Sequence, residues 1–230
     1  MTTNEQIVSD VNDAWTWIQN SLQTYLQSLI LVATSLEAAE ESKDIAAEIQ
    51  SLHELTVSLG MDPIGYYQAN LFFSQVASAE IFIQRCIKAV VLRYPQKLTS
   101  AQFKLSTILA APSIDDLVEQ AADEFLTKIM YQRPADYLSE FCSVLSIPEA
   151  SIQTHWPAFV EIKARRDVGI HNNWVCSDTY LRKIAEVRLC ANVEKGQSLI
   201  PVYRPYTSSA VESIHGLCTE IRNAVRAKYA

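Results

Sequence analysis

A regular apolar seam near the start of the chain constrains the fold more than any other feature. Apolar side chains recur there at alternating steps of four and three residues, at Val11, Trp15, Ile18, Leu22, Tyr25, Leu29 and Val32. This spacing predicts a long helix that buries one stripe of its surface. Asp10 is a suitable N-cap for this helix, and a second helix is expected from about residue 45 to Gly60, before Pro63.

Residues 1–62 are therefore predicted to form a helical hairpin, and two arrangements are compatible with its seam. In the favoured arrangement, the hairpin packs against the rest of the same chain. In the other, the seam contacts a second chain and aids dimerisation, because a heptad-like stripe can equally face a separate helix.

Long helices are also expected for residues 63–230, which we predict to be one helical domain. The chain of 230 residues holds only 5 glycines and 8 prolines, too few for the many turns of a β-sheet protein. Apolar periodicity and helix-end signals predict helices over about 65–94, 114–130, 137–145, 157–170, 179–190 and 208–229. The predicted fold class is all-α.

Composition favours a soluble cytoplasmic protein without membrane contact. The chain has no signal-peptide pattern at its start, and its most apolar run is far too short to span a bilayer. Its 5 cysteines are widely spaced and include no Cys-x-x-Cys, which fits reduced thiols. His215-x-x-Cys218 has no second ligand pair beside it, and no phosphate-cradling glycine loop is present, so neither a metal nor a cofactor is expected.

The net charge of −7 restricts how this chain could bind nucleic acid. Proteins that hold nucleic acid on a broad basic face usually have the opposite charge balance. Any RNA binding must therefore depend on a local basic patch or on a groove between subunits.

Arg166 and His171, within ARRDVGIHNNW, are the strongest candidates for chemistry. A histidine can take the proton from a ribose hydroxyl or give one to the leaving oxygen. An arginine presents a planar fork of donors that matches phosphate oxygens and stabilises charge building at phosphorus. Asp167 stands four residues before His171, so in a helix it can orient the imidazole, while Lys163 and Arg165 add local positive charge.

The spacing of this pair raises a geometric question. Five residues of helix turn through roughly 500°, which places Arg166 and His171 roughly 140° apart rather than on one face. Three explanations are open. The long arginine side chain closes the gap, the helix loosens near Gly169, or each group serves a site shared with a second subunit.

The flanking residues resemble the HEPN superfamily, particularly the RiboL-PSP-HEPN branch and the stand-alone bacterial ribonucleases and toxin-like proteins. The run EIKARRDVGIHNNWVCSDTYLRK is similar to the family signature: a doubled arginine, a polar residue, three mostly apolar residues, a histidine and an asparagine. AEIFIQRCIKAVVLRYP is similar to the first core helix, where Glu80 matches a recurrent acidic position, and YLSEFCSVLSIPEASIQTHWPAF is similar to the stretch before the motif. The resemblance covers about residues 68–228, and one departure is Trp174, where relatives often carry glycine.

The resemblance implies a HEPN-type helical bundle, here with an additional N-terminal hairpin, that dimerises so that two motifs face one cleft. Active members cut RNA without a metal, whereas other relatives are non-catalytic modules that bind a nucleotide, RNA or protein, or toxins held by an antitoxin. We therefore expect a homodimeric endoribonuclease, with a non-catalytic binding module as the alternative. The predicted site residues are Arg166, His171 and Asp167 for catalysis, Lys163, Arg165 and Asn172 for RNA or phosphate binding, and Glu80 and Tyr180 in support.

Overall fold

The computed structural model describes residues 2–41, 50–51, 54, 63–98, 105–189, 192–201 and 206–230. Within these ranges the chain is helical, and the only β feature is an isolated bridge between Val175 and Ser198. The prediction of an all-α fold is confirmed. The second helix of the predicted hairpin, over about residues 45–60, lies almost wholly outside the described residues.

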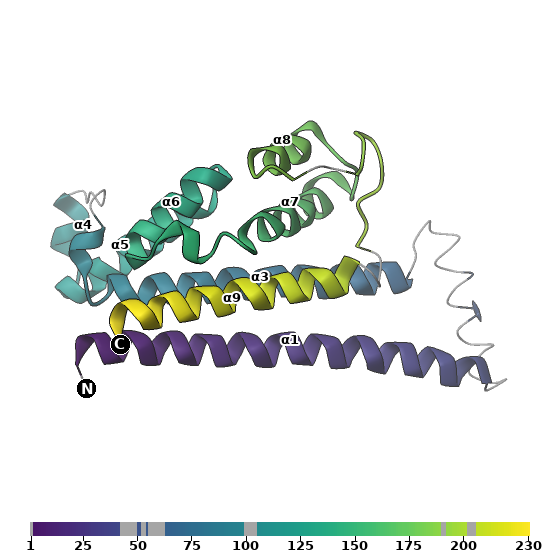
Figure 1. The fold of residues 1–230 in the computed structure, drawn as a ribbon, viewed down its shortest axis with the longest axis horizontal. Coiled ribbons are helices and arrows are strands. Elements are labelled where there is room, and N and C mark those ends of the chain that lie inside the picture. Colours follow the sequence, from purple (N-terminus) through teal and green to yellow (C-terminus); the bar gives the residue numbers. More distant parts are fainter. Residues whose placement is uncertain are drawn as a thin grey trace.

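Three long helices form one layer of the molecule: α1 (Thr3–Glu41), α3 (Pro63–Val91) and α9 (Tyr206–Tyr229). Helix α1 packs against both α3 and α9 and runs in the opposite direction to them (Figure 1). The predicted seam explains this packing, because its members Val11, Ile18, Leu22 and Tyr25 are buried in the main core. The side chains of the last two seam residues, Leu29 and Val32, lie outside the described part.

Polar contacts also attach α1 to its own chain. The guanidinium of Arg85 on α3 lies 4.4 Å from the centre of the Trp17 ring, and that of Arg222 on α9 lies 4.2 Å from Trp15. Arg222 also donates to Asn12 over 2.8 Å. From Ile7 to Tyr25, the helix therefore packs within the chain, which is the first of the two arrangements compatible with the sequence.

The second layer holds shorter helices: α4 (Leu105–Ala110), α5 (Ile114–Met130), α6 (Pro134–Leu145), α7 (Trp156–Asn172) and α8 (Asp178–Glu186). Local sequence sets their ends. The Ser113 hydroxyl accepts from the backbone NH of Asp116 at the start of α5, and Ser177 caps α8 in the same way. Proline lies in the first turn of both α6 and α7, where a missing backbone NH costs nothing.

Helix α7 ends in an unusual turn. Asn173 and Trp174 both have positive φ angles, of 47° and 63°, which side chains other than glycine rarely adopt. The buried indole of Trp174 offsets this strain, since it stacks on Phe73 with ring centres 5.1 Å apart and lies against Gly169. The turn therefore locks the C-terminal end of α7 onto α3.

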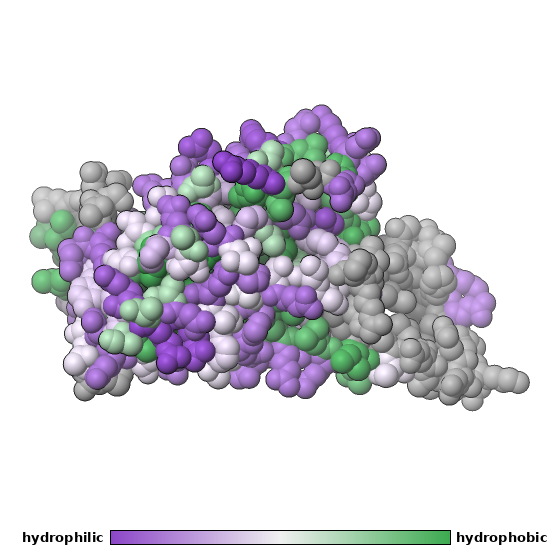
Figure 2. All heavy atoms as spheres, in the orientation of Figure 1, coloured by the Kyte–Doolittle hydropathy of each residue, from purple (hydrophilic) through white to green (hydrophobic). Residues whose placement is uncertain are grey.

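The surface is largely polar, with separate apolar areas (Figure 2). Leu109 and Ile114, at α4 and the start of α5, are 77% and 78% exposed. Ile170, Val175 and Ile200 form a second exposed set around the end of α7. No helix in the described ranges has both the length and the apolar character needed to cross a membrane.

Candidate functional site

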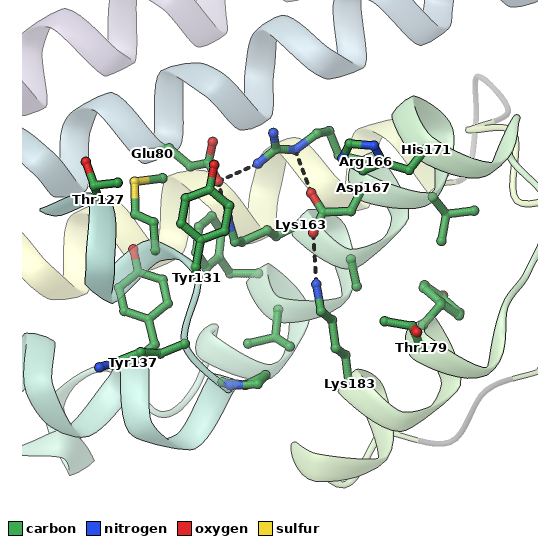
Figure 3. A pocket seen from close by; sticks show the side chains of 18 of the residues that line it. Glu80, Thr127, Tyr131, Tyr137, Lys163, Arg166, Asp167, His171, Thr179 and Lys183 are labelled. Atoms are coloured by element: carbon green, nitrogen blue, oxygen red, sulfur yellow. Dashed lines mark hydrogen bonds and ion pairs between the residues drawn. The ribbon is translucent and has the colours of Figure 1, made fainter.

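A pocket of about 810 Å³ lies along one face of α7, bounded also by α3, α5, α6 and α8. Its size falls in the range of about 300–1,000 Å³ that is common for small-molecule sites. All but one of the residues singled out from the sequence line it, namely Glu80, Lys163, Arg166, Asp167, His171, Asn172 and Tyr180. The exception is Arg165. Figure 3 labels the first five of these lining residues.

A buried carboxylate lies at the centre of the pocket. Glu80, from the middle of α3, is only 7% exposed, and its Oε1 atom accepts from both Lys163 and Arg166. The two cations are three residues apart on α7, a spacing that places them on the same helix face. Because a buried carboxylate is stable only with charged or hydrogen-bonded partners, Glu80 fixes both side chains.

A second carboxylate joins the same cluster from α7. Asp167 accepts from Lys183 of α8 over 2.9 Å, and its other oxygen lies 3.3 Å from Nε of Arg166. The sequence predicted that Asp167 orients His171. In the structure the partners of its carboxylate are instead Lys183 and Arg166, so it connects α7 to α8 and adds a third cation to the pocket.

His171 lines the outer end of the pocket, in the last turn of α7, and is exposed. Arg166 lines the same pocket, about 1.4 helical turns earlier (Figure 3). Helix α7 continues without a break through Gly169, so loosening of the helix does not explain how the two residues come to line one pocket. The long arginine side chain reaches inward to Glu80, while the imidazole remains at the rim.

Asn172 has a different environment from the one predicted. Its side-chain amide donates to the backbone carbonyl of Val175 over 2.6 Å. This bond stabilises the turn that follows α7. Asn172 is nevertheless exposed and lines the pocket, next to His171.

Arg165 does not share the position predicted for it beside Arg166. Its guanidinium donates to Glu161 over 2.8 Å and lies 3.9 Å from the centre of the Tyr206 ring. Tyr180 and Tyr206 each donate a hydroxyl to the same carboxylate over 2.6 Å. Burial, and then the negative charge of Glu161, raise the pKa of both phenols. Arg165 thus belongs to a polar cluster on another side of α7.

Several pocket residues were missed by sequence reasoning. Lys183 was within the quoted family-like run, and its position three residues after Tyr180 was a usable signal. Tyr131, Gln132 and Tyr137 form the end of the pocket at the α5–α6 connection. Burial, together with the charge of Glu80, raises the pKa of Tyr137. Nothing in their sequence spacing singles these three out.

Cations and carboxylates line the pocket in equal numbers. Lys163, Arg166 and Lys183 lie with the carboxylates of Glu80 and Asp167, and a third carboxylate of the lining, Asp123, pairs with Lys88. Arginine and lysine donors around one cavity can hold a phosphate group, and an imidazole at its rim can move a proton. Comparison of the chain with family models, curated proteins and solved structures finds no match.

Proposed function

We propose that this protein is an endoribonuclease that cuts RNA without a metal, with Arg166 and His171 as its central residues. The observation that carries the proposal is that both residues line one pocket together with Lys163 and Lys183. These cations are groups that can contact RNA phosphates in a chain with a net charge of −7. The resemblance of the residues from 161 to 183 to the HEPN signature also supports the proposal.

The proposed reaction uses the RNA itself as the nucleophile. His171 takes the proton of a ribose 2′-hydroxyl, the 2′-oxygen attacks the adjacent phosphorus, and the bond to the 5′-oxygen breaks. The leaving oxygen acquires a proton, and the products are a 2′,3′-cyclic phosphate and a 5′-hydroxyl. Arg166 stabilises the charge that develops on the non-bridging oxygens. Lys163 can hold the Glu80 carboxylate while Arg166 turns from the carboxylate to the phosphate.

A homodimer is part of the proposal, because one pocket holds a single histidine while the reaction moves two protons. A second copy of the motif would supply the second imidazole. The exposed apolar side chains Ile170, Val175 and Ile200 lie around the same end of α7 as His171, and they offer a surface for that copy. Sedimentation of the wild type and of Ile170→Asp tests this: the wild type should be dimeric and the variant monomeric and inactive.

The alternative is a non-catalytic module that binds a nucleotide, RNA or a protein such as an antitoxin. The ion pair between Arg166 and Glu80 favours it, since the guanidinium is already engaged by a carboxylate. A module of this kind would bind RNA and leave it intact.

RNA cleavage in the presence of a chelator separates the two functions. Purified wild type should cut a mixed-sequence RNA, and His171→Ala should lose at least about 100-fold in rate, the lower range of what a general acid or base contributes. His215→Ala is the matched control, because His215 is an exposed histidine of α9 outside the pocket. Uncut RNA with the wild type, or equal cutting by His171→Ala, contradicts the ribonuclease function.

A further inference from the structure

We propose that the end of the pocket formed by Tyr131, Gln132 and Tyr137 binds the base of a nucleotide whose phosphate lies at Lys163 and Arg166. This inference rests on the proposed function in one respect, the place of the phosphate. It adds a subsite that recognises the base, at the α5–α6 connection. Figure 3 shows Thr127, Tyr131 and Tyr137 on the opposite side of the pocket from His171 and Thr179, with Arg166 and Lys163 between them.

The hydroxyl of Tyr137 is the first observation behind this subsite. Tyr137 lines the pocket and is only 3% exposed, yet within the described part of the chain its hydroxyl has no hydrogen-bond partner. A buried phenol without a partner is unfavourable, because it gives up its bonds to water and gains none. A ligand that supplies a donor or an acceptor at this point removes that penalty, and nucleobases carry both on their edges.

Gln132 provides a second unused group in the same place. Its side-chain nitrogen donates to the carboxylate of Glu140 over 2.9 Å. A carboxylate only accepts hydrogen bonds, and the nitrogen is the only donor of the amide. This bond therefore fixes the positions of the amide nitrogen and oxygen. The amide oxygen of Gln132 is buried and lacks a partner among the described residues. It is an acceptor matched to an N–H group of a base.

Tyr131 provides a surface for stacking. It follows directly after α5, lines the pocket and is 87% exposed, so its ring is an aromatic face at the pocket mouth with little protein packed against it. Aromatic side chains in this position stack on bases of any identity, because every base has a π-face. Met130, which also lines the pocket, has a flexible thioether chain that can shift to let a base reach the buried hydroxyl.

The size and charge of the pocket match a nucleotide. Its volume of about 810 Å³ accommodates a base, a sugar and a phosphate. Lys163 and Arg166 lie on α7 and Lys183 lies on α8. The end near Tyr137 is lined mainly by apolar and neutral polar side chains, including Leu126, Thr127 and Pro134, and the one lining carboxylate on α5, Asp123, is paired with Lys88. This division follows the division within a nucleotide between a charged phosphate and a flat, neutral base.

Calorimetric titration with two small probes tests the subsite. Adenosine 5′-monophosphate carries a base, and ribose 5-phosphate carries the same sugar and phosphate without one. Stacking and one hydrogen bond should make the nucleotide bind at least about tenfold more tightly than the sugar phosphate. Tyr131→Ala should reduce this preference, because it removes the stacking surface, and leave the affinity for ribose 5-phosphate unchanged.

Tyr137→Phe provides the sharper variant, because it removes only the hydroxyl. It should weaken nucleotide binding about threefold to tenfold, with no loss of thermal stability, since the phenol has no hydrogen-bond partner among the described residues. Tyr94→Phe is the matched control: Tyr94 lies beyond the end of α3, outside the pocket, and its hydroxyl bonds to Asn4. Equal binding of the two probes, or no binding of either, overturns the subsite. So does a Tyr137→Phe variant that binds the nucleotide like the wild type.

The subsite and the ribonuclease function can fail separately. If the wild type cuts RNA but binds the two probes equally, the base subsite is wrong and the ribonuclease stands. If RNA stays uncut while the nucleotide binds better and the preference depends on Tyr131 and Tyr137, the subsite stands and the protein is a nucleotide-binding module.

Discussion

Replacement of Glu80 by glutamine is the most informative single change in this molecule. The substitution keeps the shape of the side chain and removes the charge that Lys163 and Arg166 share. Removing one partner of a fully buried ion pair costs about 3–5 kcal/mol. The side chains of Lys163 and Arg166 remain 18% and 19% exposed, so water partly solvates them, and the glutamine oxygen retains one hydrogen bond. We therefore expect a loss of about 2 kcal/mol.

For a chain of this length, that loss lowers the midpoint of thermal unfolding by about 4–8 °C. The same variant should bind inorganic phosphate at least about tenfold more tightly, because the carboxylate no longer competes for Arg166. Glu212→Gln is the control, since Glu212 is exposed on α9 and outside the pocket. Unfolding followed by circular dichroism and phosphate titration measure the two effects. If Glu80→Gln unfolds within about 1 °C of the wild type, Glu80 does not hold these cations together.

The remaining predictions concern the structure around the pocket. Glu161→Gln should lower the free energy of unfolding in urea by about 2–4 kcal/mol, because the Glu161 carboxylate accepts hydrogen bonds from Arg165 and two tyrosines. A loss as small as that from replacing an exposed glutamate would show that these bonds do not stabilise the fold. Gly169→Ala should cost about 1–3 kcal/mol despite the better helix propensity of alanine, because the added Cβ would lie 2.6 Å from the Trp174 ring; a gain in stability would show that this turn is not tightly packed. The free energy of unfolding should also fall in alkali, because burial raises the pKa of Tyr206 in the folded protein. The neutral phenol therefore contributes its full stabilisation below about pH 10, the pKa of the unfolded phenol, and this stabilisation is lost as the pH rises toward the pKa of the folded protein's phenol. Tyr206→Phe should remove part of this alkaline loss, and a pH profile unchanged by that variant would contradict the assignment.

The long helices were predictable because each carries its signal in adjacent turns. The seam from Val11 to Tyr25 repeats at helical spacing and is buried as expected. Proline and serine at the helix starts placed the second layer within a few residues, although α8 ends at Glu186, earlier than predicted. Helix periodicity and helix ends depend on residues within one or two turns, so the local sequence was sufficient to predict them.

The detailed site was less predictable because it depends on how helices rotate against one another. Arg165 and Arg166 are neighbours in the sequence, yet one faces Glu161 and Tyr206 while the other reaches Glu80. Only the packing of α7 against α3 and α9 decides which of them lines the pocket. The hydroxyl of Tyr137, which has no hydrogen-bond partner in the described part of the chain, is likewise a result of three-dimensional packing that residue spacing does not predict.

The most direct test of the central claim compares two matched oligonucleotides in the presence of a chelator. One is an RNA, and the other has the same sequence with 2′-deoxyribose throughout. If His171 activates a ribose 2′-hydroxyl and Arg166 stabilises the phosphate, the protein cuts the RNA to 2′,3′-cyclic phosphate ends and leaves the deoxy strand intact. Both His171→Ala and Arg166→Ala should then fail to cut the RNA. Cleavage of the deoxy strand, or RNA left whole by the wild-type protein, would contradict the account.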